Sequence, residues 1–508
     1  MPGPQLIAYA DRLGGTLAAL TGLLNSELDG VFDGVHPLPY FTPFDGVDAG
    51  FDPQDHTQVD PRLGTWDDVR LLSETHTVMT DVIVNHVSSS SQAFLDVVEN
   101  GDASPHAPMF LTLSSVFPDG VSEEELARIY RPRPGMPFTA MDLGGKRRLV
   151  WTTFTADQID IDLRTDQAWE YLTSVIDALT SNGVTMLRLD AVGYTGKEAG
   201  TDCFMTPATD EYTRRIVALA RQRGADVLVE VHGHYLQQIE IARNVDYVYD
   251  FALPPLVLHA LTTGDFAPLD NWLNLRPANS ITVLDTHDGI GIVDVGVSDL
   301  RPGEPGLMEP VDIDALVERI HDLSGGTSRL ATGAAASNLD LYQVNCTFYD
   351  ALGRCDDALI AARAIQMFTP GIPQVYYVGL LAGTNDTDLL RRTGVGRDVN
   401  RHHYTGAELS EALGHPAVRG QLDVIRLRNT HPAFNGKFSW RIDGTTATLV
   451  WTAGGEHATL FIDAAAGLFE VRATTLGEEC IVATSANTVR DGFVGAGHLV
   501  GESAHGSV

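Results

Sequence analysis

The sequence predicts an α/β fold, a closed (β/α)8 TIM barrel with two inserted subdomains and a small C-terminal β domain. Two observations predict the barrel. Short apolar runs alternate with amphipathic helical segments, which is typical of a parallel sheet. About eight such runs occur and most end in a polar or charged residue, as in a barrel whose site lies at the carboxyl-terminal rim. A doubly wound open sheet is the alternative, but no G-x-G-x-x-G turn follows the first run.

The run of residues 184–190 organises the predicted barrel. It lies between Gly183 and Gly193 and has the character of a strand buried on both faces. Arg188 and Asp190 are two residues apart, so they project from the same side of the strand. Because Arg188 would lower the pKa of Asp190, we expect the aspartate to remain ionised as a nucleophile or electrostatic stabiliser. A structural ion pair is the alternative for an isolated R-x-D.

The other predicted elements follow in chain order. The remaining strands are residues 6–10, about 32–39, 78–84, 226–232, 245–249, 280–284 and 374–378. Helices are predicted after Trp66, over residues 169–179 and over about 210–223. Thr165 and Asp166 mark the start of the second helix, and Gly183 follows its end.

The alternation of strands and helices is interrupted twice and then changes character. Residues 85–164 loosen into a Pro- and Gly-containing stretch, and residues 290–353 are rich in Gly and Ala. We therefore expect two inserted subdomains there, with the barrel built from residues 1–84, 165–289 and 354–432. Short alternating runs after residue 432 predict a β domain over 433–508, ending in a disordered tail at 501–508.

Composition excludes several classes of function. The formal charge is −33 and only three lysines occur, which argues against nucleic acid and anionic membranes as partners. No run approaches the roughly 18 apolar residues of a membrane span, and no signal peptide is evident at the start. The four scattered cysteines argue against a zinc site or disulfide framework and for a cytoplasmic location. An anionic substrate would need local arginines to recruit it, because distant charges are screened.

Three carboxylates stand at or just beyond predicted strand ends: Asp190, Glu230 and Asp288. Two carboxyls flanking a glycosidic bond are the machinery of sugar transfer, one attacking and the other protonating the leaving oxygen. Asp190 suits the nucleophile. Glu230 follows an apolar run, where partial desolvation would favour the proton-donating form. Asp288, beside His287, suits a stabiliser of positive charge at the anomeric carbon.

Each of these residues is weak evidence alone. A strand-end aspartate is often a helix cap, and a single histidine is more often part of the core than a ligand. We interpret Asp250, His36 and His76 as structural. The joint occurrence of the three acids with His86 and His287 at strand ends favours a catalytic site. If configuration is retained, nucleophile and acid should stand roughly 5–5.5 Å apart.

Four segments in the same order resemble the signature regions of the α-amylase superfamily of glycoside hydrolases and transglycosylases. They are residues 81–86 (DVIVNH), 187–191 (LRLDA), 230–232 (EVH) and 285–288 (DTHD). Within the superfamily the chain closely resembles the sucrose phosphorylase family from residue 6 to about 430. The likeness includes residues 6–13 (LIAYADRL), 36–39 (HPLP), 42–52 (TPFDGVDAGFD), 129–135 (IYRPRPG), 249–255 (YDFALPP) and 336–345 (ASNLDLYQVN).

The resemblance implies a retaining double displacement without a cofactor. Asp190 would attack the glucosyl carbon of sucrose, Glu230 would protonate the departing fructose, and inorganic phosphate would release α-glucose 1-phosphate. Residues implied to hold the glucosyl ring are Asp48, Phe51, His86, Arg188, His287, Asp288 and Arg397. Those implied on the acceptor side are Tyr194, Val231, His232, Asp340, Leu341 and Gln343. Arg133 and Tyr342 would meet phosphate, and a stiff Pro-rich loop suits Arg133 for a bidentate grip.

Two further implications concern metal and assembly. Asn85 corresponds to a calcium ligand in many amylases, yet this branch is not expected to bind calcium, so we predict no structural metal. Relatives suggest a homodimer. Gly233-His234 departs from the small-then-aromatic pair expected after His232, and Cys346 lies close to Gln343; both bear on which acceptor is preferred.

Several alternatives stay open. Sister phosphorylases acting on sucrose 6′-phosphate, glucosylglycerol or glucosylglycerate should share the three acids and differ in the acceptor loops. A sucrose hydrolase or transglucosidase would differ only in which acceptor receives the glucosyl unit. A non-catalytic barrel used as a binding module is the remote alternative, since such proteins typically have lost the catalytic acids and carry a membrane span.

Overall fold

The structure is a computed structural model. It describes residues 2–46, 48–132, 135–298, 301–332, 343–475, 477–486 and 492–493. Eight parallel strands close into a barrel in the spatial order β1-β16-β13-β12-β11-β10-β5-β2. The strands are β1 (Gln5–Ala8), β2 (Gly34–Pro37), β5 (Thr77–Ile83), β10 (Met186–Asp190), β11 (Asp226–Val229), β12 (Tyr247–Asp250), β13 (Ser280–Thr282) and β16 (Ile372–Tyr376). Each overlaps one of the predicted runs, so the predicted closed barrel is confirmed and the open sheet is excluded.

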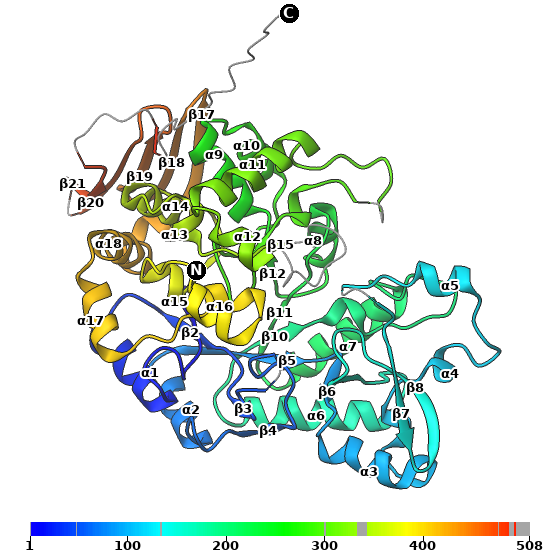
Figure 1. Cartoon of the computed structure of the whole chain (residues 1–508). Helices are drawn as coiled ribbons and strands as arrows, with labels where there is room; N and C mark the ends of the chain where they lie inside the picture. The colour runs from blue at the N-terminus through cyan, green and yellow to red at the C-terminus, as the bar shows by residue number, and fades with distance from the viewer. Residues whose placement is uncertain are drawn as a thin grey trace, which may run out of the picture.

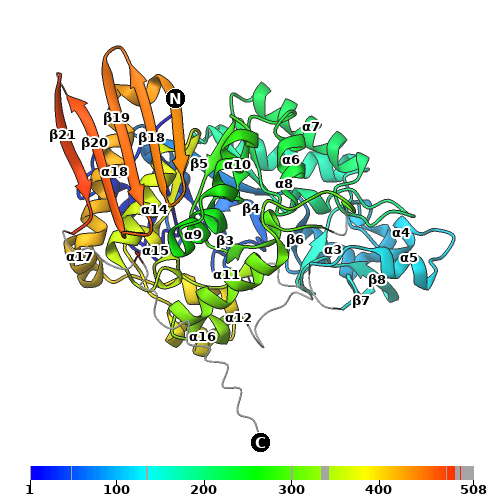
Figure 2. The same ribbon diagram turned by 90° about the horizontal axis from the view of Figure 1, so that it is seen from above.

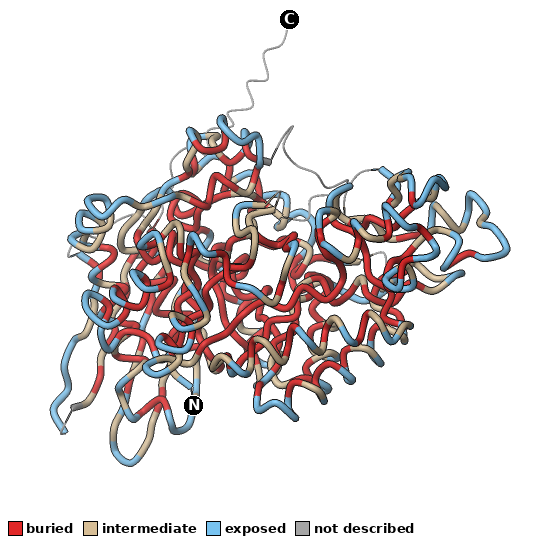
Figure 3. The backbone as a smooth tube through the Cα atoms, turned by 90° about the horizontal axis from the view of Figure 1, so that it is seen from below, coloured by how far each residue is buried: buried red, intermediate tan, exposed pale blue. Residues whose placement is uncertain are grey.

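Helices surround the barrel, as Figure 1 shows. They include α1 (Leu17–Leu24), α2 (Trp66–Ser73), α6 (Asp166–Thr180), α7 (Pro207–Gln222), α8 (Tyr235–Ile241), α9 (Leu253–Thr263), α10 (Ala267–Leu275), α14 (Asp356–Phe368) and α18 (Pro416–Thr430). The start predicted for α6 is confirmed, because the Thr165 hydroxyl accepts a hydrogen bond from Ala168 N. Buried backbone runs through the centre of the molecule and exposed backbone is confined to its outside (Figure 3).

The first insertion is more regular than the sequence predicted. It holds β6 (His86–Ser88), α3 (Gln92–Asn100), α4 (Leu113–Val116), α5 (Glu123–Arg128), β7 (Phe138–Leu143), β8 (Lys146–Trp151) and β9 (Gln158–Asp160). Strands β7 and β8 form an antiparallel hairpin closed by Gly144 and Gly145, with φ values of 58° and 78°. Two positive φ angles are what a tight hairpin turn needs. The glycine pair that suggested loose structure is therefore the turn of a hairpin.

The second insertion also contains regular structure. It holds β14 (Ile290–Gly291), η4 (Val293–Val295), α11 (Pro310–Leu323), α12 (Thr327–Thr332), β15 (Gln343–Val344) and α13 (Phe348–Ala351). Strand β15 pairs antiparallel with β14, so the far end of the insertion returns to the segment directly after Asp288.

The predicted C-terminal β domain is confirmed as a five-stranded antiparallel sheet. Its strands are β17 (Lys437–Asp443), β18 (Thr446–Ala453), β19 (Glu456–Asp463), β20 (Leu468–Thr475) and β21 (Glu478–Thr484). Trp451 Nε1 donates to the carbonyl of Phe368 at 2.7 Å, which ties β18 to the end of α14. The sheet and the first insertion lie at opposite ends of the molecule in Figures 1 and 2. The predicted tail at 501–508 lies outside the described residues.

Two further structural findings bear on the sequence expectations. Cys203 and Cys346 are buried free thiols, and Cys480 is an exposed one. Among the described residues, none of the helices combines the length and apolar character needed to cross a membrane.

Candidate active site

Arg188 joins two of the predicted catalytic acids at the rim of the barrel. It lies in β10 with 2% of its surface exposed. Its Nη1 lies 3.0 Å from Asp190 Oδ1, and its Nη2 lies 3.1 Å from Glu230 Oε1. Nη1 also lies 2.6 Å from Asp81 Oδ1, which comes from the adjacent strand β5. One buried guanidinium therefore gathers three carboxylates from strands β5 and β10 and from the residue after β11.

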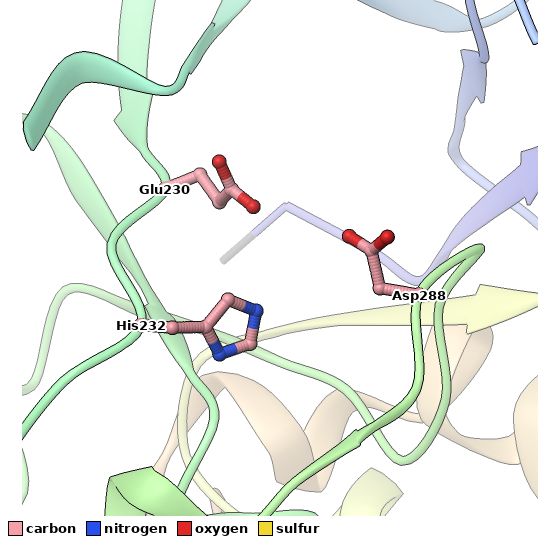
Figure 4. A group of neighbouring side chains, drawn as sticks. All are labelled: Glu230, His232 and Asp288. Atoms are coloured by element: carbon pink, nitrogen blue, oxygen red, sulfur yellow. The ribbon is translucent and has the colours of Figure 1, made fainter. Parts of the chain in front are cut away.

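Asp288 completes the acidic cluster. Glu230, His232 and Asp288 each place a carboxylate oxygen or ring nitrogen within 4.8 Å of the other two, and Figure 4 shows the three side chains facing a common space. Ala191 N donates to Glu230 Oε2 at 3.3 Å, which holds the second oxygen of that carboxyl. The three predicted acids therefore meet in one site.

The protonation of Asp190 differs from the sequence prediction. Burial, together with the charge of Glu230, raises the pKa of Asp190 well above its usual range, and Arg188 offsets this only in part. Arg188 does lower the pKa of Asp190, as predicted, but burial and Glu230 outweigh it because the same guanidinium is shared with Asp81 and Glu230. The charged form of Asp190 is therefore disfavoured in the free site.

The other two aspartates remain ionised for identifiable reasons. Burial alone would raise the pKa of Asp81, but His36 and Arg188 bring it below its usual range. Against the same effect of burial, the groups around Asp288, led by His287 and Arg397, hold its pKa well below its usual range. His36, which we interpreted as structural, lies 2.9 Å from Asp81 and acts as its second partner.

A second arginine, Arg397 in η5 (Gly396–Asn400), bridges two aspartates across the mouth of the barrel. Its Nη1 lies 2.5 Å from Asp288 Oδ1, and its Nη2 lies 2.9 Å from Asp48 Oδ1. Arg401 is buried behind them, 3.9 Å from Asp288 and 4.0 Å from Asp48. The arrangement agrees with the expectation that Arg397 and Asp48 lie on the same side of the site as Asp288.

Aromatic and imidazole rings form a wall beside these charges. Phe51 and His287 stack with centroids 4.8 Å apart and planes within 7°. His86 Nε2 lies 2.9 Å from the carbonyl oxygen of Phe51, so this nitrogen donates to it. Burial lowers the pKa of His287 to about 3, so its ring is neutral near pH 7. Flat apolar and neutral surfaces of this kind suit the face of a sugar ring.

The predicted acceptor-side residues that the structure describes come from the segments after β10 and β11 and from β15. His232 Nε2 lies 3.3 Å from Gln343 Nε2, and Val231 is buried between Glu230 and His232. Tyr194, in η3 (Val192–Tyr194), packs against a group of rings from the first insertion and the segment after η3: Tyr130, Phe154 and Phe204. Four predicted site residues, Arg133, Asp340, Leu341 and Tyr342, lie outside the described residues.

The site contains residues that sequence reasoning did not single out. Asp81 carried a signal, since a charge inside an apolar strand is costly unless paired. Arg401, Phe154 and Asp294 carried none, because their partners lie far away in the sequence.

Lys197 lies where the resemblance raised the question of calcium. Its Nζ is 3.3 Å from Asn85 Oδ1 and 2.9 Å from Asp160 Oδ2, and it also donates to the carbonyl of Tyr194. Both side chains of the ion pair are at most 2% exposed. An ammonium group thus occupies the oxygen-rich position that a cation would take.

A possible ligand set for a metal ion is formed by Glu230, His232 and Asp288. Glu230 is bound by Arg188, and Asp288 is bound by Arg397. Two of the three possible ligands therefore already pair with a guanidinium group, and the positive charges of these groups would repel a divalent cation. The residues fit proton transfer and sugar binding better than metal coordination.

Comparisons with known proteins identify the family of this chain. The family model described as "Alpha amylase, catalytic domain" matches residues 32–229. The sucrose phosphorylase of Bifidobacterium adolescentis is 55% identical over 91% of this chain and 92% of its own length. That of Agrobacterium vitis is 55% identical over 92% of this chain and 96% of its own length.

The chain belongs to the sucrose phosphorylase family.

A solved structure supports the same placement within the α-amylase superfamily. The sucrose 6F-phosphate phosphorylase from Thermoanaerobacter thermosaccharolyticum superposes with a TM-score of 0.86 at 36% identity, covering 94% of this chain and 97% of the other. The likeness to the sucrose phosphorylase family therefore spans the barrel and its insertions.

Proposed function

We propose that this protein transfers the glucosyl unit of sucrose to inorganic phosphate, giving α-glucose 1-phosphate and fructose. The observation that carries the proposal is the bridging of Asp190 and Glu230 by Arg188, at 3.0 and 3.1 Å. It supports two carboxyls acting on one glycosidic bond. The 55% identity to two sucrose phosphorylases supports sucrose and phosphate as the substrates.

In the first step, a carboxylate oxygen of Asp190 attacks the anomeric carbon of the glucosyl unit. The bond from that carbon to the bridging oxygen breaks, and Glu230 gives its proton to the departing fructose. The product is a β-glucosyl ester of Asp190. Asp288, held ionised by its arginine and histidine neighbours, stabilises the positive charge that develops on the ring.

In the second step, a phosphate oxygen attacks the same carbon from the opposite side. Glu230 now takes the proton from the phosphate hydroxyl, and the ester bond to Asp190 breaks. Two inversions give net retention, and both acids return to their starting states. The chain's own residues and the phosphate substrate supply every proton and nucleophile in this scheme, so we propose that it needs neither cofactor nor metal.

The remaining site residues divide into two groups in this proposal. The glucosyl ring is held by Asp48, Phe51, His86, Arg188, His287, Asp288 and Arg397. The acceptor side is formed by Tyr194, Val231, His232 and Gln343, with Asp340 and Leu341, and phosphate meets Arg133 and Tyr342. We infer that the insertions at 85–164 and 290–353 supply half of the acceptor side and both phosphate contacts, whereas the barrel at 1–84, 165–289 and 354–432 supplies the acids.

The proposal extends to the setting of the enzyme. We expect small-molecule substrates only, without nucleic acid or membrane as partners, because the surface charge of −33 repels polyanions. We also expect a homodimer in the cytoplasm. Light scattering at micromolar concentration tests the dimer, and a mass of one chain would contradict it.

One assay separates the phosphorylase from its alternatives. Incubation with sucrose and phosphate should give glucose 1-phosphate and fructose in equal amounts, with little free glucose. Free glucose in large excess would identify a hydrolase. Turnover of sucrose 6′-phosphate, glucosylglycerol or glucosylglycerate without turnover of sucrose would identify a sister phosphorylase. The lower identity of 36% to the sucrose 6F-phosphate phosphorylase favours sucrose.

A further inference from the structure

Asp294 is a buried aspartate behind the acceptor side of the site. It lies in η4 with none of its surface exposed. Its Oδ2 lies 2.9 Å from His232 Nδ1. Its Oδ1 accepts from the backbone N of Gly233 at 3.1 Å and from Gln238 Nε2 at 2.9 Å. All three donors come from the segment that follows β11, whereas Asp294 comes from the second insertion.

These contacts fix the ring of His232 on several sides. Phe251 stacks on the imidazole with centroids 3.8 Å apart and planes within 15°. Gly289 N donates to Gln343 Oε1 at 3.2 Å, so the amide nitrogen of Gln343 faces His232 Nε2 at 3.3 Å. Since Asp294 accepts from Nδ1, the Nδ1 proton is fixed and Nε2 is the nitrogen presented to the acceptor side.

The backbone next to Asp294 leaves room for its contact with His232. A Cβ at Gly291 would lie 2.4 Å from Asp294 Oδ2 and 3.3 Å from His232 Nδ1. Only glycine leaves room there for the carboxylate and the ring to meet. Burial alone would lower the pKa of His232, but Asp294 raises it, which makes Nε2 a more basic group than an ordinary histidine offers.

We propose that Asp294 is a positioning residue that acts through His232 on the acceptor half of the reaction. By holding the Nδ1 proton and the ring plane, it directs His232 Nε2 toward the oxygen of the incoming phosphate or departing fructose. This assignment rests on the proposed function. It concerns the partition of the glucosyl-enzyme between phosphate and water, because only the phosphate route uses an ordered acceptor contact.

The test measures that partition in Asp294→Asn. The ratio of glucose 1-phosphate to glucose at fixed phosphate should fall about tenfold to a hundredfold, as for loss of a charge-assisted hydrogen bond. Release of fluoride from α-glucosyl fluoride, whose leaving group makes no such contact, should change less than about threefold. The ratio is independent of the fraction of folded enzyme, so general destabilisation would not move it.

A double-mutant cycle shows whether Asp294 acts through His232. In a His232→Gln background, adding Asp294→Asn should leave the ratio unchanged within about twofold. An additive loss in that background, or an unchanged ratio in Asp294→Asn alone, would overturn the proposal. If the wild type makes no glucose 1-phosphate from sucrose, the proposed function fails instead.

Two variants complete the design. Asp250→Asn is the matched control, because Asp250 is also buried, accepts from Leu253 N and Trp272 Nε1, and pairs with Arg276 at the end of α10. It should lower stability and leave the ratio unchanged. If Asp294→Asn does not fold, Gly291→Ala displaces the same carboxylate and should lower the ratio in the same direction, again only while His232 is present. A ratio unchanged in Gly291→Ala would equally overturn the proposal.

Discussion

At the scale of single residues, the chemistry of the site depends on how one positive charge is divided. Arg188 has three acidic neighbours and is almost fully buried, so it cannot hold all of them ionised. Asp81 has His36 as a second partner and Asp288 has Arg397, whereas Asp190 has only a share of Arg188 and faces Glu230. The charge of Asp190 is therefore less stabilised than the charges of Asp81 and Asp288.

The first residue-scale prediction separates the two members of that pair. Glu230→Gln should lower turnover of sucrose about 10²- to 10⁴-fold, because fructose then leaves without a proton. The first step on α-glucosyl fluoride should be largely spared, since fluoride needs no proton. Asp190→Asn should abolish the reaction of both donors. The measurement is fluoride and fructose release under identical conditions, and equal loss on both donors in Glu230→Gln would argue against the acid role.

The second residue-scale prediction concerns stability. The folded-state pKa of Asp190 is raised, so ionising it disfavours the folded state, and stability is lost as pH rises through that pKa. Asp190→Asn removes this loss. It should therefore gain about 1–2 kcal/mol of unfolding free energy near pH 8, a usual gain for relieving a strained site. The gain should shrink as pH falls toward about 3.9, the ordinary value for aspartate.

Asp288→Asn is the opposite case and serves as the control. The folded-state pKa of Asp288 is lowered, so its contribution to stability is present at neutral pH and is lost as pH falls below the ordinary aspartate range. Its replacement should destabilise the protein by about 3–5 kcal/mol near pH 7, because it leaves buried arginine charge unpaired. Denaturant titrations at several pH values check both variants. If both variants changed the free energy of unfolding in the same direction near neutral pH, the assigned pKa directions would be contradicted.

At the scale of elements, the barrel was predictable and its insertions were less so. Each barrel strand is a short apolar run, and the buried faces of a parallel sheet leave that signature in the sequence. The β7–β8 hairpin was missed because its strands are polar on the exposed side, so Gly144 and Gly145 read as a loop. Contacts such as that of Asp294 with His232 join segments 62 residues apart, and no local pattern encodes them.

The element-scale prediction concerns the position of Lys197 between η3 and the first insertion. Lys197→Ala leaves Asp160 buried without its cation and should cost about 3–5 kcal/mol of unfolding free energy. Lys146→Ala is the matched control, because its pair with Asp102 is 61% and 66% exposed and should matter by less than about 1 kcal/mol. Since an ammonium group fills this position, a chelator should not change the melting temperature of the wild type. A clear drop with chelator would indicate a structural metal.

At the scale of the whole molecule, the net charge opposes the proposed reaction. The formal charge of −33 repels phosphate, whereas sucrose is neutral and is not repelled. The Debye length is about 30 Å at 0.01 M salt and about 8 Å at 0.15 M, so only dilute salt lets the whole surface act on an approaching anion. Near the site, fixed arginines such as Arg397 act over a few ångströms and are screened much less.

Salt should therefore affect the two substrates differently. Lowering ionic strength from about 0.15 M to about 0.01 M should raise the KM for phosphate several-fold and leave the KM for sucrose within about twofold. Initial rates with each substrate varied in turn, at constant pH and with chloride as the added anion, measure both constants on the same enzyme. A KM for phosphate that falls at low salt would mean that local arginines outweigh the global charge. The arginines would then recruit phosphate from beyond the site as well as hold it there.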